Sequence, residues 1–306
     1  MQKHFLHLSD YSSDEIWELL HLAKELKIKF HNKEKYKPFK DRSLAMIFAK
    51  PSARTRVSFE TGFEWMGGHA LFLGPNDIGI GKREAIKDIS RLFSRYNDII
   101  MARLFDHEHI LELAKFSTIP VINGLTDYNH PCQILADIMT IWEHRGNLDD
   151  LKITYMGDGN NIVHSWLQLA CRFPFHFVCC SPTGFEPDIK TAKMVENSGL
   201  STYELSHDPK SAVKDADVIY TDVWASMGQK EEAMEREKIF ADYQVNKSLM
   251  KNSGKETLFM HCLPAERGRE VTDSVMESKN SIVFDEAENR MHAQNAVMVY
   301  LAKKNS

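Results

Sequence analysis

The sequence predicts an α/β protein built from two doubly wound parallel sheets, and three observations support this fold class. Short apolar segments of strand length alternate with amphipathic segments of helix length. The chain has 306 residues, whereas one domain usually holds about 100–200. The alternation restarts after Gly146, so we expect domains over residues 1–145 and 146–288. A C-terminal helix at 289–306 is expected to pack back on the first domain.

The first half opens with a helix whose start is marked by a capping box, because Ser12 and Glu15 can each satisfy a backbone N–H of the other. Pro131, a favoured first-turn residue, marks the start of its last helix, and Gly67-Gly68 ends an earlier one. The expected strands are 43–49, 70–73, 98–102 and 119–122, and the later helices are 53–66, 84–95, 108–116 and 131–145.

The second half repeats the pattern, and its βα rhythm indicates parallel strands with helices on both faces. The expected strands are 152–156, 175–180, 218–221, 258–261 and 282–284, and the helices are 162–172, 188–198 and about 289–302. In such sheets, ligands bind at the carboxyl ends of the strands. The loops that leave those ends are therefore the places to look for chemistry.

The composition excludes several classes of protein. Apolar residues at 43% and charged residues at 26% suit a chain that buries sizeable cores. A net charge of −5 argues against a nucleic-acid or anionic-membrane partner, and no apolar run approaches a membrane span. The N-terminus lacks a signal-peptide pattern. Five cysteines without CxxC spacing argue against disulfides or structural zinc, so we expect a cytoplasmic protein without a metal.

The loop at residues 50–56, Lys-Pro-Ser-Ala-Arg-Thr-Arg, leads from the first strand into a helix. Helix N-termini offer unpaired N–H groups and partial positive charge that suit a phosphate. The hydroxyls of Ser52 and Thr55 and the guanidinium of Arg54 would add donors. The alternative is a Ser52 N-cap followed by two solvated arginines.

A second loop carries His130-Pro131-Cys132-Gln133. His130 and Gln133 can donate to a carbonyl oxygen, as oxyanion-hole groups do, although a lone histidine before a proline is more often a cap or a packed ring. Cys132 beside His130 suggests a nucleophile pair, but neighbouring side chains rarely point at one another.

The third loop, residues 156–162, contains Gly-Asp-Gly-Asn-Asn between a strand and a helix. Its GxGxxG pattern is incomplete, since Ile162 stands where the third glycine belongs, and no acid follows the next strand. A nicotinamide site is therefore disfavoured. Asn160 and Asn161 either bind a polar, amino-acid-like ligand or cap the helix.

The fourth region combines residues 222–228 with residues 261–265. Asp222 can pair with an amine, and Cys262 can serve as a polar lip or as a thiolate if its pKa is lowered. The alternatives are an aspartate in a turn and an inert thiol. The charged stretch 229–238 is expected to be a solvated face.

Together these loops resemble the aspartate/ornithine carbamoyltransferase family. Ser-Ala-Arg-Thr-Arg at 52–56 is similar to the family's Ser-Thr-Arg-Thr-Arg carbamoyl-phosphate loop, and 130–133 to its His-Pro-x-Gln clamp. Arg103 matches the intervening phosphate-binding arginine, and the order of motifs agrees from about residue 5 to 300. The resemblance implies an active site in the cleft between the two domains, a homotrimer and no cofactor.

The resemblance also implies roles for individual residues. The catalytic set would be Arg54, Arg103, His130, Gln133 and Cys262. Carbamoyl phosphate would contact Ser52, Ala53, Arg54, Thr55, Arg103, His130, Gln133, Cys262, Leu263 and Arg290. Residues 222–228 and 261–264 are similar to the ornithine-specific members, which implies that ornithine contacts Asn161, Asp222, Ser226 and Met227.

Two positions depart from the family's pattern. Ala53 replaces a threonine but keeps its backbone N–H, so losing one neutral donor costs about 0.5–1.5 kcal/mol. Gly79 stands where ornithine enzymes place a Gln or His that reaches a neighbouring subunit, and Lys82 or Arg83 would have to supply that contact.

The reaction implied is carbamoyl transfer from carbamoyl phosphate to the side-chain amine of L-ornithine, giving L-citrulline and phosphate in arginine metabolism. The neutral amine would attack, donors from His130 and Thr55 would stabilise the oxyanion, and the departing phosphate would accept the proton. The alternatives are putrescine or another amine as acceptor, a catalytically silent carbamoyl-phosphate-binding relative, and a dehydrogenase.

Overall fold

The computed structural model describes residues 3–80, 84–225 and 233–305. The chain forms two compact units: unit 1 comprises residues 1–139 and 289–306, and unit 2 comprises residues 140–288. Within the described ranges, no helix is both long and apolar enough to cross a membrane.

Unit 1 contains a four-stranded parallel sheet with the strand order β2-β1-β3-β4. Its elements in chain order are η1 (Leu8–Asp10), α1 (Ser13–His31), β1 (Ser43–Phe48), α2 (Ala53–Trp65), β2 (His69–Leu73), α3 (Pro75–Ile78), α4 (Ile86–Tyr96), β3 (Ile99–Arg103), α5 (His107–Phe116) and β4 (Val121–Leu125). Helix α6 (Pro131–Arg145) follows β4, and the division between the units falls within it.

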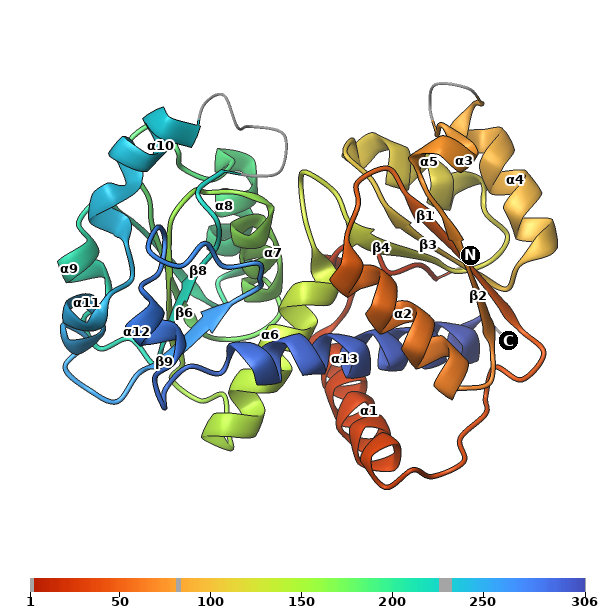
Figure 1. Cartoon of the computed structure of the whole chain (residues 1–306), viewed down its shortest axis with the longest axis horizontal. Helices are drawn as coiled ribbons and strands as arrows, with labels where there is room; N and C mark the ends of the chain where they lie inside the picture. The colour runs from red at the N-terminus through yellow and green to blue at the C-terminus, as the bar shows by residue number, and fades with distance from the viewer. Residues whose placement is uncertain (1–2, 81–83, 226–232, 306) are drawn as a thin grey trace. The chain divides into compact units, whose positions relative to one another are not determined.

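Helices cover both faces of this sheet. α4 and α5 pack on one face around Ile89, Ile100 and Leu113, whereas α2 and the C-terminal helix α13 (Val283–Lys304) lie on the other (Figure 1). The chain leaves β1 and β3 toward opposite faces, so their carboxyl ends form the switch point where doubly wound sheets bind ligands. Residues 50–56 follow β1, and Arg103 ends β3.

Unit 2 contains a five-stranded parallel sheet with the order β7-β6-β5-β8-β9. Its elements are β5 (Lys152–Met156), α7 (Asn161–Ala170), β6 (His176–Cys180), α8 (Ile189–Ser198), β7 (Thr202–Ser206), α9 (Pro209–Ala212), β8 (Val218–Thr221), α10 (Ala233–Phe240), η2 (Ala241–Tyr243), α11 (Lys247–Lys251), β9 (Leu258–His261) and α12 (Asp273–Met276).

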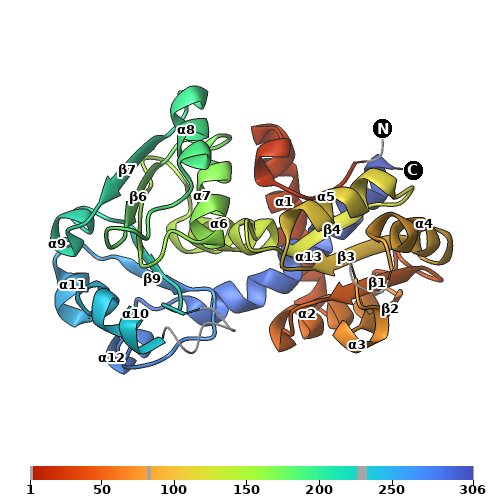
Figure 2. The ribbon, with the colours of Figure 1, turned by 90° about the horizontal axis from the view of Figure 1, so that it is seen from above.

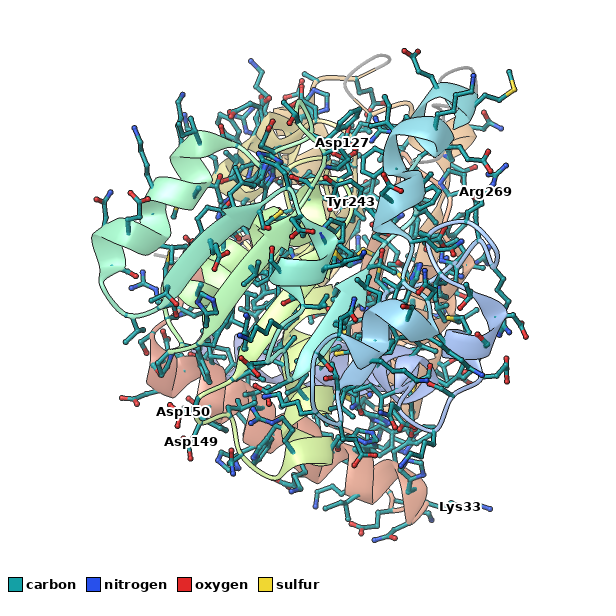
Figure 3. All side chains as sticks on the ribbon, turned by 90° about the vertical axis from the view of Figure 1, so that its left-hand side faces the viewer. Lys33, Asp127, Asp149, Asp150, Tyr243 and Arg269 are labelled. Carbon is teal, nitrogen blue, oxygen red and sulfur yellow. The ribbon has the colours of Figure 1, made fainter. Side chains whose placement is uncertain are left out.

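This sheet is also covered on both faces, with α7 and α8 on one side and α11 and α12 on the other (Figure 2). Tyr243, labelled in Figure 3, belongs to the core beneath α11, and its hydroxyl donates to the His207 carbonyl at 3.0 Å. The switch point lies between β5 and β8. Residues 157–160 follow β5 and Asp222 follows β8, so unit 2 also presents its polar loops where ligands bind.

The predicted fold class is confirmed, since both sheets are parallel and doubly wound and residues 289–304 pack in unit 1. The capping box of α1 is confirmed as well: Glu15 N donates to Ser12 Oγ at 3.2 Å and Ser12 N to Glu15 Oε2 at 2.9 Å.

The strand predicted at 282–284 is wrong, because α13 begins at Val283. A short apolar run fits a strand and a buried helix turn equally well. Asp285 and Glu286 in the first turn favour a helix N-terminus, and Ser281 makes only an isolated bridge to Phe259. The edge strand β7 was not predicted, since its burial is low and leaves little apolar pattern.

Candidate functional site

The N-terminus of α2 is capped by Ser52, as in the alternative given for the first loop. Ser52 has extended backbone angles, and its hydroxyl oxygen accepts from Thr55 N at 3.3 Å. The Ser52 hydroxyl donates to Thr55 Oγ1 at 3.1 Å. This pair fixes the first turn of the helix, whose outward N–H groups remain the kind of donor that anions bind.

Two buried arginines belong to the same neighbourhood of unit 1. Arg290, from α13, is 4% exposed and donates through Nη2 to Thr55 Oγ1 at 2.9 Å. Arg103, the last residue of β3, is 8% exposed, and its carbonyl accepts from Ala49 N at 2.9 Å. Residues from three distant parts of the chain thus gather positive charge near the α2 terminus.

His130 lies buried near these cations. Burial is the main cause that keeps the pKa of His130 well below its usual range, and Arg290 and Arg103 lower it further. The imidazole is therefore neutral at pH 7, with one N–H to donate and one nitrogen to accept. Gln133, one turn into α6, donates from Nε2 to the buried Asp137 at 2.8 Å, which orients its amide.

Arg54 is half-buried on the first turn of α2. Its Nε is buried, and among the described residues no acceptor lies within hydrogen-bonding distance of it. An anion would satisfy such a donor. Cys132 is not a nucleophile here, because burial raises the pKa of its thiol to about 12 and the thiol donates to the Asn123 carbonyl.

In unit 2, Asp222 and Cys262 come together at the carboxyl ends of β8 and β9. The Cys262 thiol donates to Asp222 Oδ1 at 3.2 Å, and Val223 N donates to the same oxygen at 2.8 Å. Asp222 Oδ2 accepts from Asn160 Nδ2 at 3.0 Å. Asp222 is partly exposed, so a cationic amine could reach its carboxylate and pair with it.

His261 stabilises the turn after β9 through a hydrogen bond to the backbone. Leu263, with a left-handed φ of 57°, donates from its N–H to His261 Nδ1 at 2.9 Å. His261 Nε2 lies 3.2 Å from Glu270 Oε1, and both side chains are fully buried. Since Nδ1 accepts, Nε2 carries the proton and donates to the carboxylate.

The case for a metal ion at this cluster is weak. Asp222, His261 and Cys262 each place one ligand atom within 4.8 Å of the others. Both ring nitrogens of His261 are already engaged by Leu263 and Glu270, however, so the histidine would have to give up a hydrogen bond to bind an ion.

The Asn160 side chain both contacts Asp222 and caps α7. Its Nδ2 donates to Asp222, and its Oδ1 accepts from Ile162 N at 2.9 Å. Of the two asparagines weighed in the sequence analysis, the resemblance assigned Asn161 to ornithine, and that role stays a prediction. The two asparagines are adjacent, and only the direction of the cap distinguishes them. An Asn at the N-cap position immediately before the apolar run is the signal that favours Asn160.

A feature that the sequence analysis missed is the ion pair between the buried Arg236 and the partly exposed Asp158. Arg236 lies within the stretch expected to be a solvated face, yet it is 8% exposed. Its Nη2 donates to Asp158 and its Nε to the Trp224 carbonyl at 2.6 Å, while its guanidinium lies over the Phe185 ring. Arg236 therefore joins the loop after β5 to the loop after β8.

Several candidates lie outside the described residues, namely Ser226, Met227, Lys82 and Arg83. Gly79 is described: it ends α3 with a left-handed φ of 52°, which favours glycine.

The fold and these clusters define a class: a two-unit α/β protein with a cluster of arginines at one switch point and a polar cluster centred on an aspartate at the other. Residues 3–143 match the model of the aspartate/ornithine carbamoyltransferase carbamoyl-P binding domain, and residues 149–301 match that of the Asp/Orn binding domain. The chain belongs to the aspartate/ornithine carbamoyltransferase family.

Relatives within the family are similar over nearly the whole chain. A chloroplastic ornithine carbamoyltransferase from Pisum sativum is 58% identical over 99% of this chain and 81% of its own. An anabolic ornithine carbamoyltransferase from Pyrococcus furiosus is 52% identical over 95% and 93%. A solved structure of an ornithine carbamoyltransferase from Pyrococcus furiosus is 51% identical, with a TM-score of 0.93, and the match covers 97% of this chain and 96% of that chain. A solved structure of an anabolic ornithine carbamoyltransferase from Campylobacter jejuni is 36% identical, with a TM-score of 0.93, and covers 99% of this chain and 100% of that chain.

Proposed function

We propose that this protein is an ornithine carbamoyltransferase, which moves the carbamoyl group of carbamoyl phosphate to the side-chain amine of L-ornithine and releases L-citrulline and phosphate. The observation that carries the proposal is the α2 terminus of unit 1, where Arg54 and the buried Arg290 and Arg103 lie near a neutral histidine. A dianionic donor with a carbonyl group matches that charge pattern. The relatives named above support the choice of ornithine.

The donor would bind through its phosphate at the first turn of α2. Ser52, the Ala53 backbone and Thr55 supply neutral donors, and Arg54, Arg103 and Arg290 supply charged ones. Residues 1–145 with 289–306 thus form the carbamoyl-phosphate domain of the proposal.

His130 and Gln133 would hold the carbamoyl end. A neutral His130 donates one N–H to the carbonyl oxygen and does not compete with the arginines for the phosphate. When the amine attacks, the oxygen gains negative charge, and preorganised donors from His130 and Thr55 stabilise it. Collapse breaks the C–O bond to phosphate, which leaves with the proton of the amine. No covalent enzyme intermediate is needed.

The acceptor would bind in unit 2, with residues 146–288 as the ornithine domain. Asp222 pairs with the α-ammonium group, and Asn160 and Asn161 offer amide donors and acceptors beside it. Cys262 and Leu263 would line the path of the reacting amine. Ser226 and Met227 complete the set by resemblance alone.

We also propose a cytoplasmic homotrimer. Unit 1 exposes large apolar side chains that suit a subunit contact: Val57 on α2 is 59% exposed, Leu71 on β2 is 43% exposed and Phe105 after β3 is 47% exposed. Light scattering after gel filtration tests this, and a monomeric mass would contradict it.

The activity is tested by initial rates at constant carbamoyl phosphate with ornithine, putrescine, aspartate and N-acetylornithine as acceptors, scored by product mass. We expect ornithine to be preferred at least 100-fold, about 2.7 kcal/mol of transition-state discrimination. A preference for putrescine would contradict the Asp222 assignment but keep the donor site. Tight carbamoyl-phosphate binding without turnover would indicate a silent relative.

A further inference from the structure

Two histidines from distant parts of unit 1 face each other through their Nε2 atoms. His7, before η1, and His107, at the start of α5, have these atoms 2.8 Å apart, with ring centroids 4.9 Å apart. His7 Nδ1 lies 2.9 Å from Asp10 Oδ2, and His107 Nδ1 lies 2.9 Å from Thr126 Oγ1. These groups form one continuous chain of hydrogen bonds from the surface inward.

This chain of hydrogen bonds ends in the loop that carries His130. Thr126 N donates to the Asn129 carbonyl at 2.9 Å, and Asn129 N donates to Thr126 Oγ1 at 3.3 Å. Asn129 is fully buried, and its Nδ2 donates to the Leu6 carbonyl at 3.0 Å. Because Asn129 directly precedes His130, the hydrogen bonds of Thr126 and Asn129 hold the backbone from which the His130 side chain projects.

The proton positions along the chain follow from its partners. An ionised Asp10 only accepts, so His7 Nδ1 carries a proton. With a neutral His7, Nε2 must accept, and His107 must then carry its proton on Nε2. His107 Nδ1 in turn accepts from the Thr126 hydroxyl.

One added proton reverses this direction. If His7 is cationic, its Nε2 donates to His107 Nε2, so His107 carries its proton on Nδ1 and donates to Thr126 Oγ1. The Thr126 hydroxyl then turns to Asn129 Oδ1, which lies 3.3 Å away. The pair gains one proton in total, and the Thr126 hydroxyl changes its acceptor from His107 Nδ1 to Asn129 Oδ1.

The surroundings oppose a positive charge on the His107 ring. Burial and His7 lower the pKa of His107 to about 4, against the opposing charges of Asp106 and Asp10. Tyr128 contributes only its ring, with its centroid 4.8 Å from that of His107. On the N-terminal segment, burial lowers the pKa of His4, whose Nδ1 accepts from Val121 N at 3.1 Å.

We propose that His7 and His107 are positioning residues for carbamoyl transfer: the proton held by this pair sets the hydrogen-bond direction at Thr126 and Asn129, and through them the alignment of His130. This inference rests on the proposed function, because His130 is assigned there to the carbamoyl oxygen. Neither histidine touches the reacting atoms.

The first test compares pH profiles of kcat/KM for carbamoyl phosphate, from pH 5.5 to 9, in the full chain and in His107→Gln. We expect a histidine-type step between about pH 5 and 8 that is present in the parent and absent from the variant, with KM for ornithine changed less than twofold. His109→Gln, on the same helix, is the matched control and should keep the parent profile. His7→Gln repeats the test if His107→Gln does not fold.

The second test observes the tautomers directly, by NMR of protein labelled with ¹⁵N-histidine. We expect His107 to pass from the Nε2–H to the Nδ1–H form as pH falls from 8.5 to 5.5. A single His107 tautomer across this range, or a parent pH profile in both Gln variants, overturns the proposal. If the parent transfers no carbamoyl group to any acceptor, the proposed function fails, and the tautomer spectra alone decide whether the pair switches.

Discussion

Arg290 Nη2 donates a hydrogen bond of 2.9 Å to Thr55 Oγ1, although the two residues are 235 positions apart in the chain. The contact joins the C-terminal helix to the first turn of α2. It ties the last helix to unit 1 and adds a second buried cation to the neighbourhood of Arg103.

We predict that Arg290→Gln lowers kcat/KM for carbamoyl phosphate about 10- to 100-fold, because hydrogen bonds of charged groups contribute about 1.5–3 kcal/mol. Thr55→Val should act in the same direction. Since the two residues share one contact, the double variant should lose less than the product of the single losses. Multiplicative losses in steady-state kinetics would contradict the coupling.

Arg54→Ala should reduce kcat/KM for carbamoyl phosphate at least 100-fold, because it removes the buried Nε–H group that would donate to the phosphate. Arg91→Ala is the control, because Arg91 is an exposed arginine on α4 that pairs with Asp88. Its activity should stay within twofold of the parent. Turnover of Arg54→Ala within a few-fold of the parent would refute the phosphate assignment.

Asp222→Asn keeps the shape of the side chain and removes its charge. We predict a rise of at least 30-fold in KM for ornithine, about 2 kcal/mol for a lost charge-assisted contact, with carbamoyl-phosphate binding unchanged. Cys262→Ser retains a donor to Asp222 and should cost less than Cys262→Ala. Equal effects of the two Cys262 variants on ornithine KM would show that this hydrogen bond is unimportant.

Much of this site was predictable because its residues stand at strand ends, where a motif and its position agree. The start of α2 at Ala53 and the ends of β5, β8 and β9 matched the expected bounds, so Ser52, Asp222 and Cys262 fell in the expected loops. Periodicity fixes such ends wherever a buried strand meets a capped helix.

The remaining features depend on tertiary contacts that leave no local pattern. Arg236 sits among charged neighbours and looks solvated, and only its burial against Asp158 and Phe185 distinguishes it. The His7–His107 contact joins residues 100 positions apart. No spacing rule relates such residues, because the fold and not the local sequence brings them together.

Arg236→Gln should destabilise the protein by about 1.5–3 kcal/mol, since it removes the charged partner of the partly exposed carboxyl of Asp158. Because the pair joins the loops that carry Asn160 and Asp222, KM for ornithine should rise as well. Arg269, which lies at the surface in Figure 3 and pairs with Glu266, provides the control Arg269→Gln. Urea unfolding and ornithine KM measure both effects, and an unchanged KM would restrict Arg236 to a structural role.

Glu15 links both ends of unit 1, because it accepts from Lys3 and, at 2.7 Å, from the Tyr300 hydroxyl. Burial tends to raise the pKa of Glu15, but hydrogen bonds from Lys3, the Ser12 backbone and Tyr300 outweigh it and lower the pKa to about 2. A glutamate in the unfolded chain has a pKa of about 4.3. Glu15 therefore stabilises the fold above about pH 4.3, and this contribution is lost as pH falls toward 2.

We predict that Glu15→Gln lowers the free energy of unfolding by about 1 kcal/mol at pH 7, a value discounted because solvent screens this partly exposed group. The difference from the parent should halve by about pH 3. Glu18→Gln is the control, since Glu18 is exposed and lies 3.5 Å from Lys304 Nζ. Urea unfolding at several pH values measures both variants. A difference for Glu15→Gln that stays constant down to pH 3 would mean that its packing, and not its charge, holds the C-terminal helix to α1.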